Sequence, residues 1–240
     1  SCGTGANCAG GLTPWGTYLT AEENFDGLFS GSSSDLTEPS REDAYALDVL
    51  SHGYPTYYIP NSIMPEQFRI GINPHGPSLY GWIVEIDPYD PTSTPKKRTA
   101  LGRKKNECAN TAIARDGRIA VYTGDDQRGE HLYKFVTSGR FDPSNRGANM
   151  DLLDDGDLYA AQFLEDGQGR WLKITLEAAN AAAEAAESPI RFRDHGDLVM
   201  RVRDAARFLG ATPMDRPEDV EPICDANWRG TGAVLVCCTN

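Results

Sequence analysis

The residues of this sequence that could hold a metal ion begin with one cysteine and two adjacent glutamates. Cys8, Glu22 and Glu23 stand in the segment NCAGGLTPWGTYLTAEENF, residues 7–25. A thiolate is a soft ligand that favours iron, zinc or copper, whereas carboxylates favour calcium, magnesium or ferric iron. Together they predict a mixed cluster, with a transition metal beside harder cations. The alternative for a single cysteine is a small buried apolar side chain.

Three further groups of acidic residues could complete such a cluster. Each stands at or near the end of a predicted strand: Glu107, then Asp125 and Asp126, then Asp215, Glu218 and Asp219. Acidic residues at strand ends usually face water, and that alternative applies to each group taken alone. Several groups at strand ends can instead meet where the segments of a β-propeller converge on its central channel.

A turn restricted by prolines presents an arginine in the segment GATPMDRPEDVEP, residues 210–222. Pro213 and Pro217 stiffen the backbone around Arg216. A guanidinium can bind a phosphate through two parallel hydrogen bonds, and a carboxylate beside it, such as Glu218, can hold a cation. The alternative is a helix that begins after Pro217, with Arg216 in a surface salt bridge.

The sequence lacks the motifs of several other enzyme classes. Its four histidines show neither HxH nor HExxH spacing, and it contains no GxSxG elbow and no phosphate-binding loop. A run of basic residues predicts a solvated patch, in which Arg103 or a neighbour could face an anionic substrate. The patch comprises Lys96, Lys97, Arg98, Lys104 and Lys105.

The composition is that of a soluble globular protein. An excess of 35 Asp and Glu over 23 Lys and Arg argues against nucleic acid or an anionic membrane as a partner and suits a protein that holds cations. No apolar run is long enough to span a membrane. The six cysteines leave one or two disulfides open. No signal peptide stands at the start, so we expect a mature segment or a fragment of a longer chain.

The elements that must position these residues are mostly short strands rich in aromatic and β-branched residues. They are predicted over 16–23, 80–87, 117–126, 131–136, 156–164, 169–174 and 232–238. Asp-Gly turns in ARDGRIAV and LEDGQGRW predict hairpins. Helices are predicted over 176–188 and 197–210. The pattern predicts an all-β sandwich, barrel or propeller in a single domain, residues 1–240, with a helical insertion at about 176–210.

Six motifs follow one another along nearly the whole chain: NCAGGLTPWGTYLTAEENF, YGWIVEIDPYDP, KKRTALGRKKNECA, YTGDDQRGEHLYKFV, LDDGDLYAAQF and AARFLGATPMDRPEDVE. In this order they resemble the PhoX family of secreted alkaline phosphatases. The resemblance implies a six-bladed β-propeller, a site of ferric iron and calcium ions at one end of its central channel, and a periplasmic or secreted location. Family members have strands before the first motif and after the last residue of this chain, so we expect the propeller to be incomplete here.

The resemblance also implies roles for single residues. Cys8 would bridge two irons, and Arg216 would contact the phosphate. The carboxylate ligands would be Glu23, with Glu22 beside it, Glu107 and Glu218; Asp125, Asp126 and Asp215 are lesser candidates. Catalysis would rest on Arg216, Glu23 and Cys8. The family motif LGRFxHE is LGRKKNE here, so that Lys104 and Asn106 replace an aromatic residue and a histidine while Glu107 remains.

The leading prediction is a monomeric, metal-dependent phosphomonoesterase that acts on small phosphate esters. One alternative is a non-catalytic calcium-binding propeller that binds a partner, and another is a propeller lactonase or related metal hydrolase. Cys8 and Arg216 discriminate among the three. A calcium scaffold does not need a thiolate, and a lactonase does not need an arginine that binds phosphate.

Overall fold

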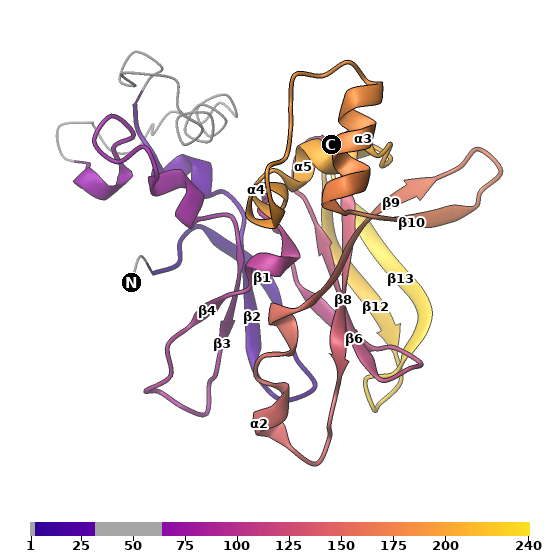
Figure 1. The fold of residues 1–240 in the computed structure, drawn as a ribbon. Helices are drawn as coiled ribbons and strands as arrows, with labels where there is room; N and C mark the ends of the chain where they lie inside the picture. The colour runs from indigo at the N-terminus through magenta and orange to yellow at the C-terminus, as the bar shows by residue number, and fades with distance from the viewer. Residues whose placement is uncertain (1–2, 32–63) are drawn as a thin grey trace.

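The computed structural model describes residues 3–31 and 64–240, and it consists mainly of antiparallel strands (Figure 1). Within the described residues, the strands form one sheet of four, one sheet of five and two pairs, and none of these sheets closes on itself. The all-β prediction is therefore confirmed at the level of class. A six-bladed propeller is not visible in this arrangement.

The four-stranded sheet carries the first of the chemically interesting residues. Its strands, in spatial order, are β1 (Asn7–Leu12), β2 (Tyr18–Glu22), β3 (Ile83–Ile86) and β4 (Lys96–Lys97). The turn between β1 and β2 is closed by the Thr13 hydroxyl, which accepts a hydrogen bond of 3.0 Å from the Thr17 backbone N–H. β2 and β3 lie where the sequence predicts strands. β1 was not predicted, because its Ala-Gly-Gly centre has low strand propensity.

The five-stranded sheet contains both predicted Asp-Gly hairpins. Its strands, in spatial order, are β10 (Gly169–Lys173), β9 (Gly156–Phe163), β8 (Leu132–Arg140), β6 (Arg118–Gly124) and β5 (Asn110–Ile113). Gly117 turns β5 into β6 and Gly167 turns β9 into β10, both with positive φ, of 86° and 81°. Such turns favour glycine, so the two hairpin predictions are confirmed with their physical reason.

Two short sheets complete the β structure. One pairs β7 (Arg128–Glu130) with β11 (Met214–Asp215), and the other pairs β12 (Pro217–Cys224) with β13 (Gly230–Cys238). Because Pro217 begins a strand, the alternative of a helix after this residue is wrong. The described cysteines, Cys8, Cys108, Cys224, Cys237 and Cys238, are all free thiols.

The helical segment lies where the sequence predicts it but is divided differently. It contains α3 (Leu176–Ala185), α4 (His195–Met200) and α5 (Val202–Phe208). α3 is capped by Thr175, whose hydroxyl accepts from the Ala178 N–H at 3.1 Å. The second predicted helix is broken at Arg201, whose ψ of 36° interrupts the helical path. In the described part of the chain, no helix is long and apolar enough to cross a membrane.

The remaining helical pieces are short connections. They are α2 (Arg146–Asn149) and the 3-10 turns η1 (Phe25–Leu28), η3 (Glu66–Phe68), η4 (Gly76–Leu79), η5 (Thr99–Leu101) and η6 (Leu152–Asp154). α2 lies at the lower end of the molecule in Figure 1, opposite the end at which α3, α4 and α5 pack.

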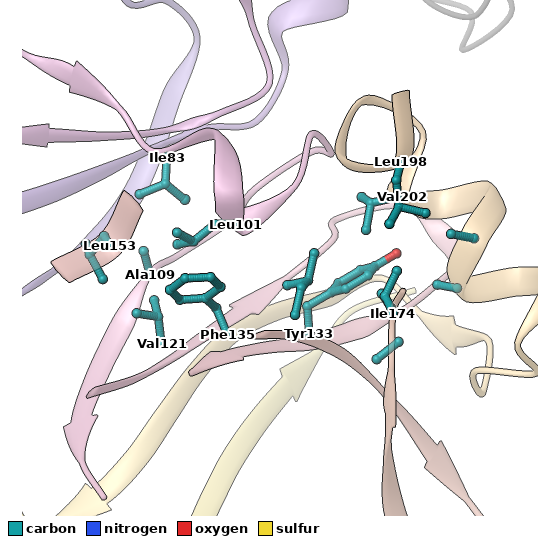
Figure 2. Close-up of a cluster of buried hydrophobic side chains, with 14 of the residues drawn as sticks. Ile83, Leu101, Ala109, Val121, Tyr133, Phe135, Leu153, Ile174, Leu198 and Val202 are labelled. Atoms are coloured by element: carbon teal, nitrogen blue, oxygen red, sulfur yellow. The ribbon is translucent and has the colours of Figure 1, made fainter. Parts of the chain in front are cut away.

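The main hydrophobic core joins the two large sheets to these helices (Figure 2). Phe135 and Val121 contribute side chains from the five-stranded sheet, Ile83 from the four-stranded sheet, and Leu198 and Val202 from α4 and α5. Full burial of such a side chain contributes roughly 1.5–3 kcal/mol. The core therefore fixes the helical segment against the sheets, and with it any residue that the helices present to the site.

The prediction that the basic patch is solvated is wrong, because three of its five members, together with the neighbouring Arg103, are buried. Arg98, Arg103, Lys104 and Lys105 are each at most 4% exposed. Arg98 pairs with Glu85 at 2.7 Å and with Asp154. Burial lowers the pKa of Lys104 to about 7, and its Nζ donates to the Leu101 carbonyl at 3.0 Å. Lys104 stands where the family motif has an aromatic residue, and its side chain is buried in the interior.

Candidate metal centre

Two overlapping sets of potential ligands meet at one place in the fold. Cys8, Glu23 and Glu107 form the first set, and Glu107, Asp126 and Glu218 form the second. Within each set the ligand atoms lie within 4.8 Å of one another. The Cys8 thiol donates to Glu107 Oε1 at 3.1 Å. Segments from both ends of the chain therefore converge on Glu107, which the two sets share.

Irregular strand pairing directs two of these side chains. The register between β1 and β2 shifts between Asn7 and Gly10, which brackets Cys8. The register between β12 and β13 shifts between Pro217 and Val220, which brackets Glu218. A bulge bends its strand and re-aims the side chain it carries. Cys8 and Glu218 thus both lie at irregularities in strand pairing, which sequence patterns do not predict.

The middle of the cluster is held by backbone hydrogen bonds between neighbouring segments. The Glu107 N–H donates to the Gly124 carbonyl at 3.2 Å, and the Asp126 N–H donates to the Lys105 carbonyl at 2.9 Å. The Glu23 N–H, directly after β2, donates to the Ala6 carbonyl at 3.0 Å. These bonds fix the backbone from which each carboxylate extends.

A close backbone approach brings Glu218 to this centre. A Cβ atom on Gly124 would lie 2.1 Å from the Glu218 carbonyl oxygen and 2.2 Å from that of Pro217. β12 can therefore pack against the end of β6 only because position 124 has no side chain.

Gly124→Ala is expected to push β12 away from β6 and to cost about 1–3 kcal/mol of unfolding free energy, as overpacking does. Urea unfolding measures this cost, and metal content should fall in the same variant because Glu218 is displaced. Gly27→Ala is the matched control, since nothing lies within 4 Å of a Cβ atom at Gly27. Equal stability of the two variants would contradict the expected displacement.

Burial and neighbouring acids raise the pKa of Cys8, Glu23 and Glu107. The pKa of Asp126 is lowered instead, because burial, which would raise it, is outweighed by hydrogen bonds and positive charge, chiefly from Arg216. Partial burial, the hydrogen bond to Glu107 and the nearby carboxylate charges raise the pKa of Cys8 to about 12. Burial, followed by the adjacent Asp126 carboxyl and the charge of Glu107, raises the pKa of Glu23 to about 8. Burial also raises the pKa of Glu107, and the charge of Glu218 adds to this. The centre therefore lacks positive charge for its number of acids.

These residues fit a cluster of metal ions. Asp126 Oδ1 is buried and, among the described residues, has no hydrogen-bond partner. Cations placed among the ligand atoms would neutralise the crowded acids, ionise the thiol and satisfy this oxygen. One sulfur and several carboxylates are the donors expected of a softer transition metal beside harder cations.

Arg216 lies beside the carboxylates on a cavity of about 540 Å³. Its Nη2 atom lies 2.7 Å from Asp126 Oδ2 and 3.1 Å from Glu218 Oε1. The backbone at Arg216 has φ of 52°, a left-handed conformation that is unusual outside glycine. The cavity is lined by Glu23, Asn24, Lys105, Asp126, Gln127, Arg128, Arg216 and Asn240. An anion that enters it would meet Arg216 and Lys105 next to the acidic cluster.

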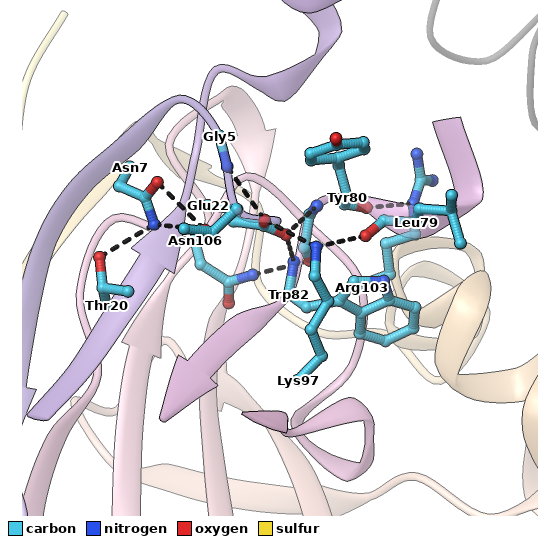
Figure 3. Close-up of polar contacts among 12 residues, drawn as sticks. Gly5, Asn7, Thr20, Glu22, Leu79, Tyr80, Trp82, Lys97, Arg103 and Asn106 are labelled. Atoms are coloured by element: carbon cyan, nitrogen blue, oxygen red, sulfur yellow. Dashed lines mark hydrogen bonds and ion pairs between the residues drawn. The ribbon is translucent and has the colours of Figure 1, made fainter. Parts of the chain in front are cut away.

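The structure does not bring Glu22 into the cluster. Its carboxylate is fully buried and accepts hydrogen bonds from the backbone N–H groups of Gly81 and Trp82 at 3.0 Å and from Lys97 Nζ at 2.8 Å. Figure 3 shows the contacts of Glu22 with Trp82 and Lys97. Adjacent residues of an extended chain point to opposite sides, which separates Glu22 from Glu23. Glu22 therefore joins β2 to β3 and β4.

Substitution of each glutamate by glutamine should distinguish the role of Glu22 from that of Glu23. Glu23→Gln is expected to lower metal affinity by at least ~10-fold, the loss typical of disturbing a metal site. Glu22→Gln is expected to lower unfolding free energy by about 1–3 kcal/mol, because one buried acceptor becomes a donor. Elemental analysis and urea unfolding of both variants provide the measurements. The reverse pattern, with metal lost only from the Glu22 variant, would contradict this separation.

Two other predicted ligands also lie outside both sets. Asp125 has no exposed surface and forms an ion pair with Arg203 of α5. Asp215 is about half exposed and lies 3.7 Å from Arg128. Of the predicted ligands, the structure thus gathers Cys8, Glu23, Glu107, Asp126 and Glu218, and it places Glu22, Asp125 and Asp215 in other contacts.

The sequence analysis placed Lys105 in a solvated basic patch and did not name Asp26. Lys105 Nζ lies 3.0 Å from Asp26 Oδ2, and both side chains are buried next to the cavity. The only signal was the run KKN directly before Glu107, which resembles a solvated charge run unless its distant partner is known. Lys105 lines the cavity together with the basic residues Arg128 and Arg216.

Comparisons with known proteins show the family to which this chain belongs. The model of the family described as "Alkaline phosphatase PhoX" matches residues 1–240. The structure of Pseudomonas fluorescens PhoX in complex with vanadate, a transition state analogue, is similar with a TM-score of 0.78 and 40% sequence identity. The match covers 91% of this chain and 37% of that chain, so this chain spans well under half of the length of that relative. No curated protein matches the sequence. A family match over every residue, supported by this identity, shows that the chain belongs to the PhoX alkaline phosphatase family.

Proposed function

We propose that this chain forms the metal centre of a metal-dependent phosphomonoesterase that releases inorganic phosphate from small phosphate esters. The observation that carries the proposal is the convergence of one thiol and four carboxylates beside Arg216, which lines one cavity together with two of those carboxylates, Glu23 and Asp126. A scaffold that only binds calcium would not need the thiol, and a lactonase would not need the guanidinium. The resemblance to a protein that binds vanadate supports a phosphoryl group as the part recognised.

The donor set supports a division of the cations between two kinds of ligand. Cys8 would hold iron, with Glu23 and Glu107 as its carboxylate neighbours, because sulfur favours a transition metal. Asp126 and Glu218, which offer only oxygen, suit calcium. When bound, such ions supply charge neutralisation for a phosphoryl group and lower the pKa of a water molecule.

The protein's own residues would bind and orient the ester. Arg216 can direct its guanidinium at oxygens of the phosphoryl group that do not react, because Asp126 and Glu218 already hold it at the edge of the cavity. Lys105, which lines the same cavity and is held in place by Asp26, would add positive charge. Phosphoryl transfer depends mainly on such positioning and charge stabilisation.

Three broader expectations accompany this function. The sheets would be blades of a six-bladed propeller, of which this chain supplies a part, as its coverage of the Pseudomonas relative suggests. The protein would act in the periplasm or outside the cell, as the family resemblance implies. It would act as a monomer, since the cluster is built from residues of one chain.

Metal analysis and turnover on the same purified sample test the proposal. Iron together with calcium, hydrolysis of p-nitrophenyl phosphate and inhibition by vanadate are the expected results. Calcium without iron and without turnover would instead favour a non-catalytic scaffold. Hydrolysis of lactones without hydrolysis of phosphate esters would favour the alternative hydrolase.

A further inference from the structure

A buried ion pair connects the helical segment to the strands that carry the candidate ligands. Arg203 of α5 donates from Nε to Asp125 Oδ2 at 2.7 Å and from Nη2 to Asp125 Oδ1. Its Nη1 atom donates to Gln127 Oε1 at 3.2 Å. The two parallel bonds to Asp125 are the fork geometry that makes an arginine–carboxylate pair directional as well as strong.

Asp125 in turn lies between two ligand-bearing segments. Its Oδ1 atom accepts from the Lys105 N–H at 3.2 Å, and its backbone forms an isolated bridge with Asn106. Glu107 follows the first of these segments, and Asp126 follows Asp125 directly. Because both carboxylate oxygens of Asp125 already accept hydrogen bonds, Asp125 acts as a link between the segments.

We propose that Arg203 is a positioning residue that, through Asp125, sets the separation of Glu107 and Asp126 required to hold cations. This inference rests on the proposed function, because it requires the two ligand sets to hold metal. It assigns to the helical segment a part in the centre that neither the family resemblance nor the sequence patterns indicated. The hydrogen bonds of Arg203 described above go to Asp125 and Gln127, which belong to neither set of ligands.

The chemistry of the fork predicts graded effects for two substitutions. Arg203→Lys keeps a positive charge near Asp125 but loses the second parallel bond. Arg203→Met keeps much of the apolar stem and leaves the Asp125 carboxylate buried without its cation, so that the turn carrying Asp126 must move. Metal affinity should therefore fall in the order wild type, Arg203→Lys, Arg203→Met.

Arg146 offers a matched control at the opposite end of the fold. It also forms a two-point contact with one aspartate, Asp87, at 2.7 Å and 2.9 Å, and it lies on α2, far from α5 (Figure 1). Arg146→Lys and Arg146→Met thus remove the same kind of two-point contact, although Arg146 Nε also donates to the Trp15 carbonyl, in the turn between β1 and β2, at 2.8 Å. Because the Arg146 side chain is 41% exposed and that of Arg203 is 13% exposed, the metal loss of each variant is compared with its measured thermal stability.

The experiment measures iron and calcium per folded chain after dialysis against graded chelator, with thermal unfolding of each variant beside it. We expect about 10–100-fold weaker metal retention for Arg203→Met, a smaller loss for Arg203→Lys, and wild-type retention for both Arg146 variants. If Arg203→Met does not fold, the comparison of Arg203→Lys with Arg146→Lys decides the question.

Two results would overturn the inference. Wild-type retention in the folded Arg203 variants would leave the proposed function standing and remove the positioning role. An equal loss of metal in the Arg146 variants would mean that the Arg203 substitutions act through general stability. By contrast, wild-type protein that holds no iron or calcium at any chelator concentration would remove the proposed function itself, and the positioning role with it.

Discussion

Cys8→Ala is expected to reduce the iron content of the purified protein to below about a tenth of the wild-type value and to lower phosphatase turnover by at least ~10³-fold. Cys8 is the only sulfur in either ligand set of the described residues, and sulfur is the donor that favours iron over calcium. Calcium content should fall less, because Asp126 and Glu218 remain. Elemental analysis and a p-nitrophenyl phosphate assay on one sample measure both effects.

The fold should survive this substitution, because Cys8 is exposed at the edge of the sheet. We therefore expect the melting temperature of the metal-free variant to stay within a few degrees of that of metal-free wild type. Cys224→Ala, at the far end of β12 from Glu218, is the matched control and should retain iron. Full iron retention in Cys8→Ala would contradict the role proposed for the thiol.

Arg98→Met is expected to be the most destabilising of the substitutions considered, at about 3–5 kcal/mol of unfolding free energy. The guanidinium is buried and holds Glu85, which also accepts hydrogen bonds from Trp15 Nε1 at 2.9 Å and Thr17 Oγ1 at 2.5 Å. Removing the arginine leaves the Glu85 carboxylate buried without a cation. Urea unfolding of metal-free protein measures the loss directly.

The neighbouring pair of Lys96 and Asp151 provides the comparison. These side chains lie 2.5 Å apart but are 47% and 71% exposed, so Lys96→Met should cost no more than about 1 kcal/mol. The two variants differ in burial and in little else, since both remove a basic residue from one short segment. Equal costs would mean that water reaches Arg98 and that its burial has been overstated.

Strands with clear alternation and Asp-Gly turns could be predicted from the sequence, whereas strands made of small or proline-rich segments could not. β6, β8 and β9 carry β-branched and aromatic residues that favour extended structure in any context. β1 and β12 contain Gly10, Gly11, Pro217 and Pro222, which disfavour a strand locally. Pairing with β2 and β13 overrides that preference, and pairing is a long-range property.

The candidate ligands were predictable as residue types but not as an arrangement. The sequence could not separate Glu22 from Glu23, because the choice depends on the register of β2, which directs neighbouring side chains to opposite sides. In the same way, Lys105 and Arg98 resemble a solvated charge run, because Asp26, Glu85 and Asp154 are remote in sequence. The burial of a charged side chain can be predicted only when its partner is known.

The span of the ligand sets along the chain constrains the order of folding. Cys8 lies near the start of the chain, whereas Glu218 lies on β12, which among the described strands pairs with β13, the strand that follows it. During synthesis, a nascent chain without β12 and β13 holds a thiol and three carboxylates of the two sets but lacks Glu218. Contacts between such distant segments form late, after loop-closure entropy has been overcome. The donors of both sets therefore come together only after the hairpin of β12 and β13 docks, so we expect cation capture to follow that step.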